Sequence, residues 1–134
     1  MLRYDGNELI YPELSYFIVG SCFEVHNSLG RYAREKQYGD ALAKKLKDHG
    51  IKFQKEIPIG VSGNIVDFLI DDKIIIELKA KSIITKGDYY QAQRYLQESG
   101  LKLGIIVNFR DEHLKPRRVV KTTIRSHSLY SHSH

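Results

Sequence analysis

Two apolar runs separated by only three polar residues constrain the fold of this chain more than any other feature. The first run is Ile65–Ile70 and the second is Ile74–Ala80, and both are rich in the β-branched residues that favour strands. The residues between them, Asp71-Asp72-Lys73, are typical of a tight connection. The sequence therefore predicts two adjacent strands joined as a hairpin.

Each of these runs is interrupted by charged residues. Glu77 and Lys79 are two residues apart in the second run, so both lie on one face of a strand. Asp67 interrupts the first run. A three-residue loop sets Asp67 opposite Glu77, whereas a two-residue loop sets it opposite Ile76 unless a bulge intervenes. The prediction that the two carboxylates share a face therefore depends on the register of the hairpin.

Two carboxylates this close repel each other unless a cation lies between them or one of them is protonated. Oxygen ligands of this kind suit Mg²⁺ or Mn²⁺, which retain several waters and take one or two protein carboxylates. A lysine beside such an ion can orient a water or stabilise charge on a phosphate. The alternative is that Asp67, Glu77 and Lys79 form a cross-strand ion cluster at a sheet edge.

The other elements follow from hydrophobic spacing and from the residues that end each element. The order is predicted as α-α-β-β-β-α-β. The last strand is almost uniformly apolar, which indicates burial on both faces. Besides the two runs above, the predicted segments are a helix at 12–29, a helix at about 34–49, a strand at 51–61, a helix at 85–99 and a strand at 101–109.

One carboxylate is predicted on the inward face of the second helix. Tyr38, Leu42 and Leu46 recur every four residues along that face, and Glu35 lies three residues before Tyr38. A carboxylate is an unusual residue at such a position. We therefore include Glu35 among the candidate site residues.

The net charge of the chain is concentrated at its C-terminal end. Of 21 Lys and Arg, five follow His113 and no acid accompanies them, so the remaining 16 balance the 16 Asp and Glu. The formal excess of +5 therefore lies in this segment, which could contact phosphates or remain a solvated basic tail. We expect residues 1–112 to form a single domain and residues 113–134 to be a basic, Ser/His-rich segment with a mobile end.

Cysteine usage and hydropathy predict a cytoplasmic protein. Cys22 is the single cysteine, which fits a reducing compartment and a buried helical position. No apolar run approaches the roughly 20 residues that cross a bilayer. The first residues carry acids and lack the apolar core of a secretory signal. We expect no membrane association.

Five stretches together carry a resemblance to a known family. In them the chain resembles the small bacterial and archaeal proteins called the GxxExxY family, placed in the PD-(D/E)XK nuclease superfamily. The resemblance extends over Gly20–Phe109, about two-thirds of the chain. The stretches are IVGSCFEVHNSLG (18–30), EKQY (35–38), Asp67, IIIELKA (74–80) and YLQESGLKLGIIVNF (95–109).

The resemblance implies a restriction-endonuclease-like α/β core, with a mixed central β-sheet flanked by helices. It also implies a Mg²⁺- or Mn²⁺-dependent nuclease, a hydrolase that acts on phosphodiester bonds of nucleic acid. DNA is expected by analogy with the superfamily.

The same resemblance assigns a role to several residues. Asp67 and Glu77 would hold the metal, joined by the Leu78 carbonyl and, through water, by Glu35. Lys79 would assist attack, and Gln91 would orient the site. Tyr38 matches the family tyrosine, and a core aromatic on a helix face is an equally good interpretation.

The small size of the domain bears on its expected partners and on its alternative function. A domain of this size covers little duplex, so a homodimer or a larger protein partner is expected. The alternative function is a catalytically silent nucleic-acid-binding or protein-interaction subunit that retains the nuclease fold. The candidate nucleic-acid contacts are Lys81, Lys86, Lys115, Arg117 and Arg118.

Overall fold

The structure, a computed structural model, describes residues 10–122 as three helices and a five-stranded sheet. The strands follow the order β1-β2-β3-β4-β5, with β3 and β4 parallel and the other neighbouring pairs antiparallel. The predicted α/β class, the mixed sheet and the order of the first seven elements are confirmed. The elements are α1 (Pro12–Leu29), α2 (Glu35–Asp48), β1 (Phe53–Ile59), β2 (Asn64–Ile70), β3 (Ile74–Lys79), α3 (Lys86–Ser99), β4 (Leu103–Asn108) and β5 (Arg117–Val120).

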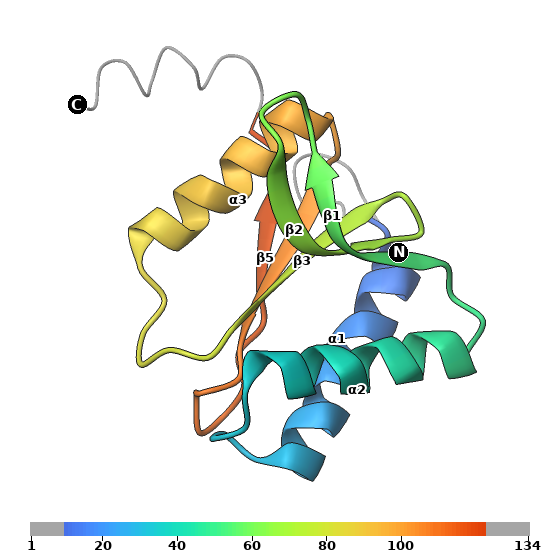
Figure 1. Cartoon of the computed structure of the whole chain (residues 1–134), viewed down its shortest axis with the longest axis vertical. Coiled ribbons are helices and arrows are strands. Elements are labelled where there is room, and N and C mark those ends of the chain that lie inside the picture. Colours follow the sequence, from blue (N-terminus) through green and yellow to red (C-terminus); the bar gives the residue numbers. More distant parts are fainter. Residues whose placement is uncertain (1–9, 123–134) are drawn as a thin grey trace.

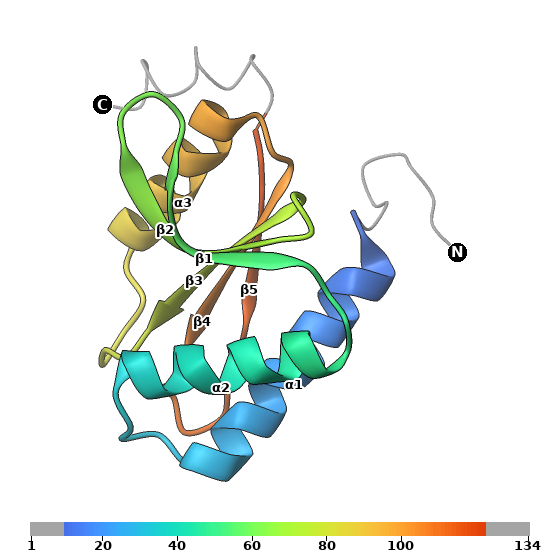
Figure 2. The ribbon, with the colours of Figure 1, turned by 45° about the vertical axis from the view of Figure 1, so that its right-hand side comes forward.

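The sheet lies between two helical layers (Figures 1 and 2). Helices α1 and α2 pack on one face and α3 packs on the other. Parallel strands need a long crossover between them, and α3 supplies it between β3 and β4. All six residues of β4 are buried, as the apolar run predicts for a strand covered on both faces.

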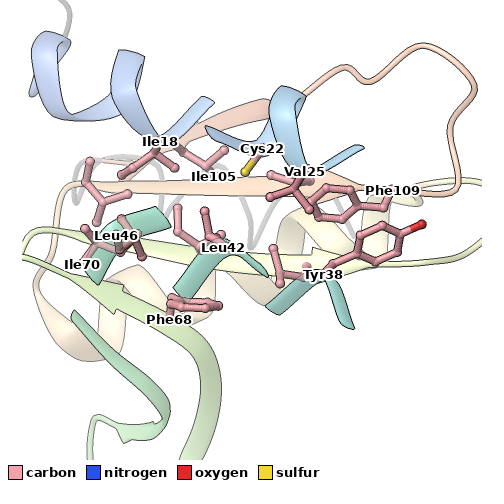
Figure 3. Packing of buried hydrophobic residues seen from close by; sticks show 14 of the residues in the cluster. Ile18, Cys22, Val25, Tyr38, Leu42, Leu46, Phe68, Ile70, Ile105 and Phe109 are labelled. Carbon is pink, nitrogen blue, oxygen red and sulfur yellow. The ribbon is translucent and has the colours of Figure 1, made fainter. Parts of the chain in front are cut away.

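The main hydrophobic core lies between the sheet and the α1–α2 layer (Figure 3). Cys22 is fully buried in this core, and burial raises the pKa of its thiol to about 12. The thiol therefore stays protonated at neutral pH, and Cys22 acts as a small apolar residue. The side chains drawn together in the core include Ile18, Val25, Leu42, Leu46, Phe68, Ile70 and Ile105.

Tyr38 is part of this core and joins the end of α1 to the start of α2. Its ring stacks on Phe109, with centroids 4.1 Å apart, and the side chain has no exposed surface. Its hydroxyl donates a hydrogen bond to the Gly30 carbonyl and accepts one from the Ala33 N–H at 3.1 Å. These contacts account for the tyrosine as a core residue, one of the two interpretations of this position.

The tip of the β1–β2 hairpin is fixed to the end of α3 (Figure 2). Glu98 Oε1 accepts hydrogen bonds from Ser62 Oγ at 2.7 Å and from Asn64 Nδ2 at 3.3 Å. Gly60, with φ 68°, comes so close that a Cβ there would lie 2.6 Å from Glu98 Cβ. Only glycine therefore fits at this contact.

The edge strand β5 was not predicted. Residues 117–120 were assigned to the basic C-terminal segment, yet they pair antiparallel with β4. Two of the four are arginines and only Val119 is buried, so apolar alternation is too short to indicate a strand. Residues 123–134, which include the end predicted to be mobile, lie outside the described residues.

Within residues 10–122, no helix combines the length and the apolar composition needed to span a bilayer.

Replacing Tyr38 by Phe is expected to lower the free energy of unfolding by about 0.5–1.5 kcal/mol, since the part-buried hydrogen bonds of its hydroxyl to the Gly30 carbonyl and the Ala33 N–H are lost. Urea denaturation measures the change. Tyr16→Phe is the matched control, because that side chain is 82% exposed and its loss of a hydroxyl should change stability by less than about 0.5 kcal/mol. Equal stability of the two variants would contradict the structural role of the hydroxyl.

Candidate active site

The register of the β2–β3 hairpin brings the two predicted carboxylates opposite each other. Ile70 pairs with Ile74 across a three-residue loop, and the pairing continues to Phe68 and Ile76. Asp71 and Asp72 at the start of the loop take left-handed backbone conformations, with φ of 54° and 55°. The same register sets Asp67 opposite Glu77. Of the two loop lengths considered from the sequence, the three-residue loop is the one observed.

The regular sheet pairing is interrupted at Asp67 on both sides. Pairing with β3 ends at Phe68, and pairing with β1 passes from Lys55–Phe68 directly to Ile57–Val66. Glu56, which would face Asp67, has a left-handed φ of 51°. The buried side chains change layer here, because Phe68 packs with α1 and α2 whereas Val66 packs with α3. Asp67 therefore lies at a kink, where the usual ladder hydrogen bonds are absent.

The two carboxylates replace the missing ladder bonds. The Asp67 N–H donates to Glu77 Oε2 at 3.1 Å, and the Leu78 N–H donates to Asp67 Oδ2 at 2.7 Å. Each carboxylate thus uses one oxygen to bind the opposite strand. Within residues 10–122, the second oxygen of each accepts no hydrogen bond. The hairpin fixes both side chains and leaves one oxygen of each without a hydrogen-bond donor among these residues.

Burial makes it unfavourable to ionise this pair. Glu77 is 7% exposed, and burial followed by the charge of Asp67 raises its pKa to about 7. Burial, with a contribution from the Glu35 charge, also raises the pKa of Asp67. The Lys79 ammonium lowers both pKa values and offsets part of this effect. A second positive charge at the pair would remove the remaining penalty.

Asp67 opens onto a cleft of about 270 Å³ between α2 and the hairpin. Lys55, Glu56 and Leu78 line it from the strands. Glu35 lines it from α2, but its side chain is exposed and does not share the buried environment of Tyr38. The reason is its place as the first residue of α2, ahead of the turn that packs on the sheet. Glu35 therefore lies at the rim of the cleft.

Helix α3 positions Lys79. The Lys79 ammonium donates to Gln91 Oε1 at 3.4 Å and lies 3.8 Å from Asp88 Oδ1. Asp88 also binds the Lys81 ammonium at 2.8 Å and accepts the Thr85 N–H at the start of α3. Sequence reasoning did not include Asp88 in the site. The Thr-x-x-Asp pattern ahead of a helix is the signal that could have indicated its capping role.

The predicted nucleic-acid contacts do not form one surface. Arg117 donates to the Tyr89 hydroxyl on α3, whereas Arg118 donates to Ser15 on α1. Adjacent residues of a strand point to opposite faces, so these two arginines lie on opposite sides of the sheet. Lys81 is paired with Asp88, while Lys86 and Lys115 are exposed.

The donor set fits a hydrated divalent cation better than a closed metal centre. Within residues 10–122, no group of three or more His, Cys, Asp or Glu side chains is arranged to hold a metal ion. A closed zinc site needs such a group, whereas Mg²⁺ is commonly held by one or two carboxylates and several waters. The free oxygens of Asp67 and Glu77 supply two carboxylates.

Comparison with known proteins identifies one family. A sequence model described as the PD-(D/E)XK nuclease superfamily matches residues 12–121, which contain every helix and strand above. No curated protein matches the chain. Among solved structures, the chain is similar to one described as the crystal structure of SSO0001, with 19% identity and a TM-score of 0.49. That similarity covers 90% of this chain, which spans 62% of the length of the other.

Glu77→Gln is expected to stabilise the metal-free protein at pH 8 and to leave its stability near pH 4 unchanged. The pKa of Glu77 rises from 4.5 to about 7 on folding, so ionisation opposes folding and the wild type loses about 3 kcal/mol of stability as the pH rises through that range. Glutamine cannot ionise, yet its amide oxygen can still accept the Asp67 N–H. Urea denaturation of both proteins in EDTA at pH 4, 6 and 8 measures the difference. A difference in stability between the two proteins that does not change with pH would refute the raised pKa of Glu77.

Proposed function

Because the chain belongs to the PD-(D/E)XK nuclease superfamily, we propose that it is a divalent-metal-dependent nuclease that hydrolyses phosphodiester bonds of nucleic acid. Within the superfamily we assign it to the GxxExxY proteins, and DNA is the proposed substrate. The observation that supports this most is the Asp67–Glu77 pair, whose two side chains are fixed by main-chain N–H groups of the opposite strand.

Asp67 and Glu77 would hold Mg²⁺ or Mn²⁺ through their free carboxylate oxygens. The Leu78 carbonyl is a further proposed ligand, and Glu35 at the rim of the cleft would hold the ion through water. When bound, such an ion lowers the pKa of water and offsets the negative charge of a phosphate.

Lys79 is the proposed positioning group for the attacking water or for a phosphate oxygen. Its hydrogen bond to Gln91 limits where the ammonium can lie, and the Asp88 carboxylate lies 3.8 Å from it. A fixed ammonium is more effective than a mobile one, because no reorganisation is needed when charge develops.

A catalytically silent binding subunit is the rival function, and the acidic pair argues against it. Ionised, the two carboxylates would repel the phosphates that such a subunit would bind, and burial makes that ionised form costly, as their raised pKa values indicate. A cation relieves both effects, which favours a metal-dependent enzyme. A homodimer or larger partner and a cytoplasmic location are further parts of the proposal.

Cleavage of labelled single-stranded, duplex and branched DNA, and of RNA, with Mg²⁺ or Mn²⁺ tests this function. We expect Glu77→Gln to lower the cleavage rate by at least about 100-fold, because one metal ligand is lost. Asp72→Asn is the matched control, since Asp72 is on the exposed loop and asparagine tolerates its φ of 55°. Undiminished cleavage by Glu77→Gln would exclude the proposed site.

Lys79→Met is expected to separate chemistry from metal binding. The variant should lower cleavage by about 10²–10³-fold, as loss of one preorganised donor does in other enzymes. Calorimetric titration should show that Lys79→Met still binds Mn²⁺ and that Glu77→Gln does not. Normal cleavage by Lys79→Met, or loss of Mn²⁺ binding in it, would contradict the role assigned to the lysine.

A further inference from the structure

A second charged cluster lies next to the acidic cleft and contains two arginines and a tyrosine. Arg31 is in the α1–α2 loop and Arg110 follows β4. Arg31 Nε donates to the Arg110 carbonyl and Arg110 Nε donates to the Arg31 carbonyl, both at 2.9 Å. The two guanidinium groups lie 5.1 and 5.4 Å from the centre of the Tyr32 ring. The reciprocal bonds hold the two positive charges beside one ring.

The charges of this cluster have no counter-ion in the described part of the chain. Within residues 10–122, no carboxylate lies within ion-pair distance of Arg31 or Arg110, and their terminal Nη groups make no hydrogen bond. Of the nearby acids, Asp111 accepts a hydrogen bond from Asn108 and Glu112 is exposed. Tyr32 is 73% exposed, so the cluster faces solvent. An anion placed there would offset the repulsion between the two guanidinium groups.

The cluster lies at the same edge of the sheet as the acidic pair. The Phe109 N–H donates to the Lys79 carbonyl at 2.9 Å, which places Arg110 next to the end of β3. Arg31 is four residues before Glu35, which lines the cleft. Figures 1 and 2 show the α1–α2 loop beside the β4–β5 loop. In α/β sheets, ligands bind outside the carboxyl ends of the parallel strands, and β3 and β4 both end here.

We propose that Arg31, Tyr32 and Arg110 bind the phosphate backbone of a nucleic-acid strand beside the bond that is cleaved. This inference rests on the proposed function and adds the surface that holds the substrate. Guanidinium groups match phosphate oxygens in a fork-like geometry, and here each Nε is already fixed by the main chain. The free Nη groups then bind with little loss of side-chain entropy, and the exposed tyrosine adds a hydroxyl donor.

The test measures binding without catalysis. Fluorescence anisotropy of a fluorescein-labelled 20-nucleotide single strand, and of its duplex, is recorded in EDTA over a range of KCl, with every variant made in the Glu77→Gln chain. Neutralising both charges in R31Q/R110Q should weaken binding about 10- to 100-fold near 0.1 M salt. It should also reduce the salt slope, the steepness with which the logarithm of the binding constant falls with the logarithm of the KCl concentration, by about 2. The matched control R94Q/K102Q removes the same charge from exposed positions elsewhere and should leave the slope within about 0.5 of the parent.

A second pair of measurements separates charge from local folding. R31K/R110K keeps both charges but loses the reciprocal Nε bonds, and it should recover most of the salt slope. In the Glu77→Gln chain with its arginines intact, the Nε–Hε resonances of Arg31 and Arg110 should shift when the 20-nucleotide strand is added. Unchanged resonances, or binding by R31Q/R110Q equal to that of the parent, would overturn the proposal. So would equal binding of labelled poly-glutamate, since that result would indicate a site for acidic protein.

Failure of this inference can be told apart from failure of the proposed nuclease activity. If the wild type cleaves nothing yet R31Q/R110Q lowers the salt slope, the phosphate surface is supported and catalysis is not. If the wild type cleaves the strand, R31Q/R110Q in the otherwise wild-type chain should keep the wild-type kcat. Its KM for the cleaved strand should rise about 10-fold or more. An unchanged KM would exclude the cluster as the substrate surface while leaving the nuclease intact.

Discussion

The structure depends on an exchange of hydrogen bonds at the kink in β2. Where the sheet pairing is interrupted, the Asp67 and Glu77 carboxylates accept the main-chain N–H groups that the ladder leaves unpaired. An unpaired buried N–H is costly, so the kink and the two acids stabilise each other. The same bonds fix the direction of each carboxylate and leave one oxygen free. The two carboxylates and the two N–H groups thus stabilise the kink and also orient the acids that are proposed to bind the metal.

The acidic site could be predicted because its geometry is contained in one hairpin. Alternation along a strand sets Glu77 and Lys79 on one face, and the loop length determines which residue lies opposite Glu77. The three polar residues between the apolar runs indicate that length, and the observed pairing of Ile70 with Ile74 follows. The helices could be predicted equally well, since proline and glycine mark the two ends of α1.

Features that depend on contacts between distant segments could not be predicted in this way. Periodicity places Glu35 on the face of Tyr38, but only the packing of α2 shows that burial begins at Tyr38 and that Glu35 stays exposed at the rim of the cleft. The strand β5 depends on β4 for its hydrogen bonds and has little apolar pattern of its own. Arg31 and Arg110 are 79 residues apart, and nothing in their local sequences indicates that they bind each other.

The hairpin also has a consequence for the conformational entropy of the site. Asp67 and Glu77 are separated by ten residues, whereas Glu35 and Asp67 are separated by 32 and the two arginines by 79. The entropy lost on closing a loop grows with its length, and a loop of about ten residues closes in roughly 10–100 ns. Of these three pairs, the two acids proposed to bind the metal are the one that the chain brings together most readily, and Glu35 and the two arginines join through progressively longer closures. Most of the loop-closure entropy of the site is therefore spent on Glu35 and on the two arginines, and little of it on the acidic pair.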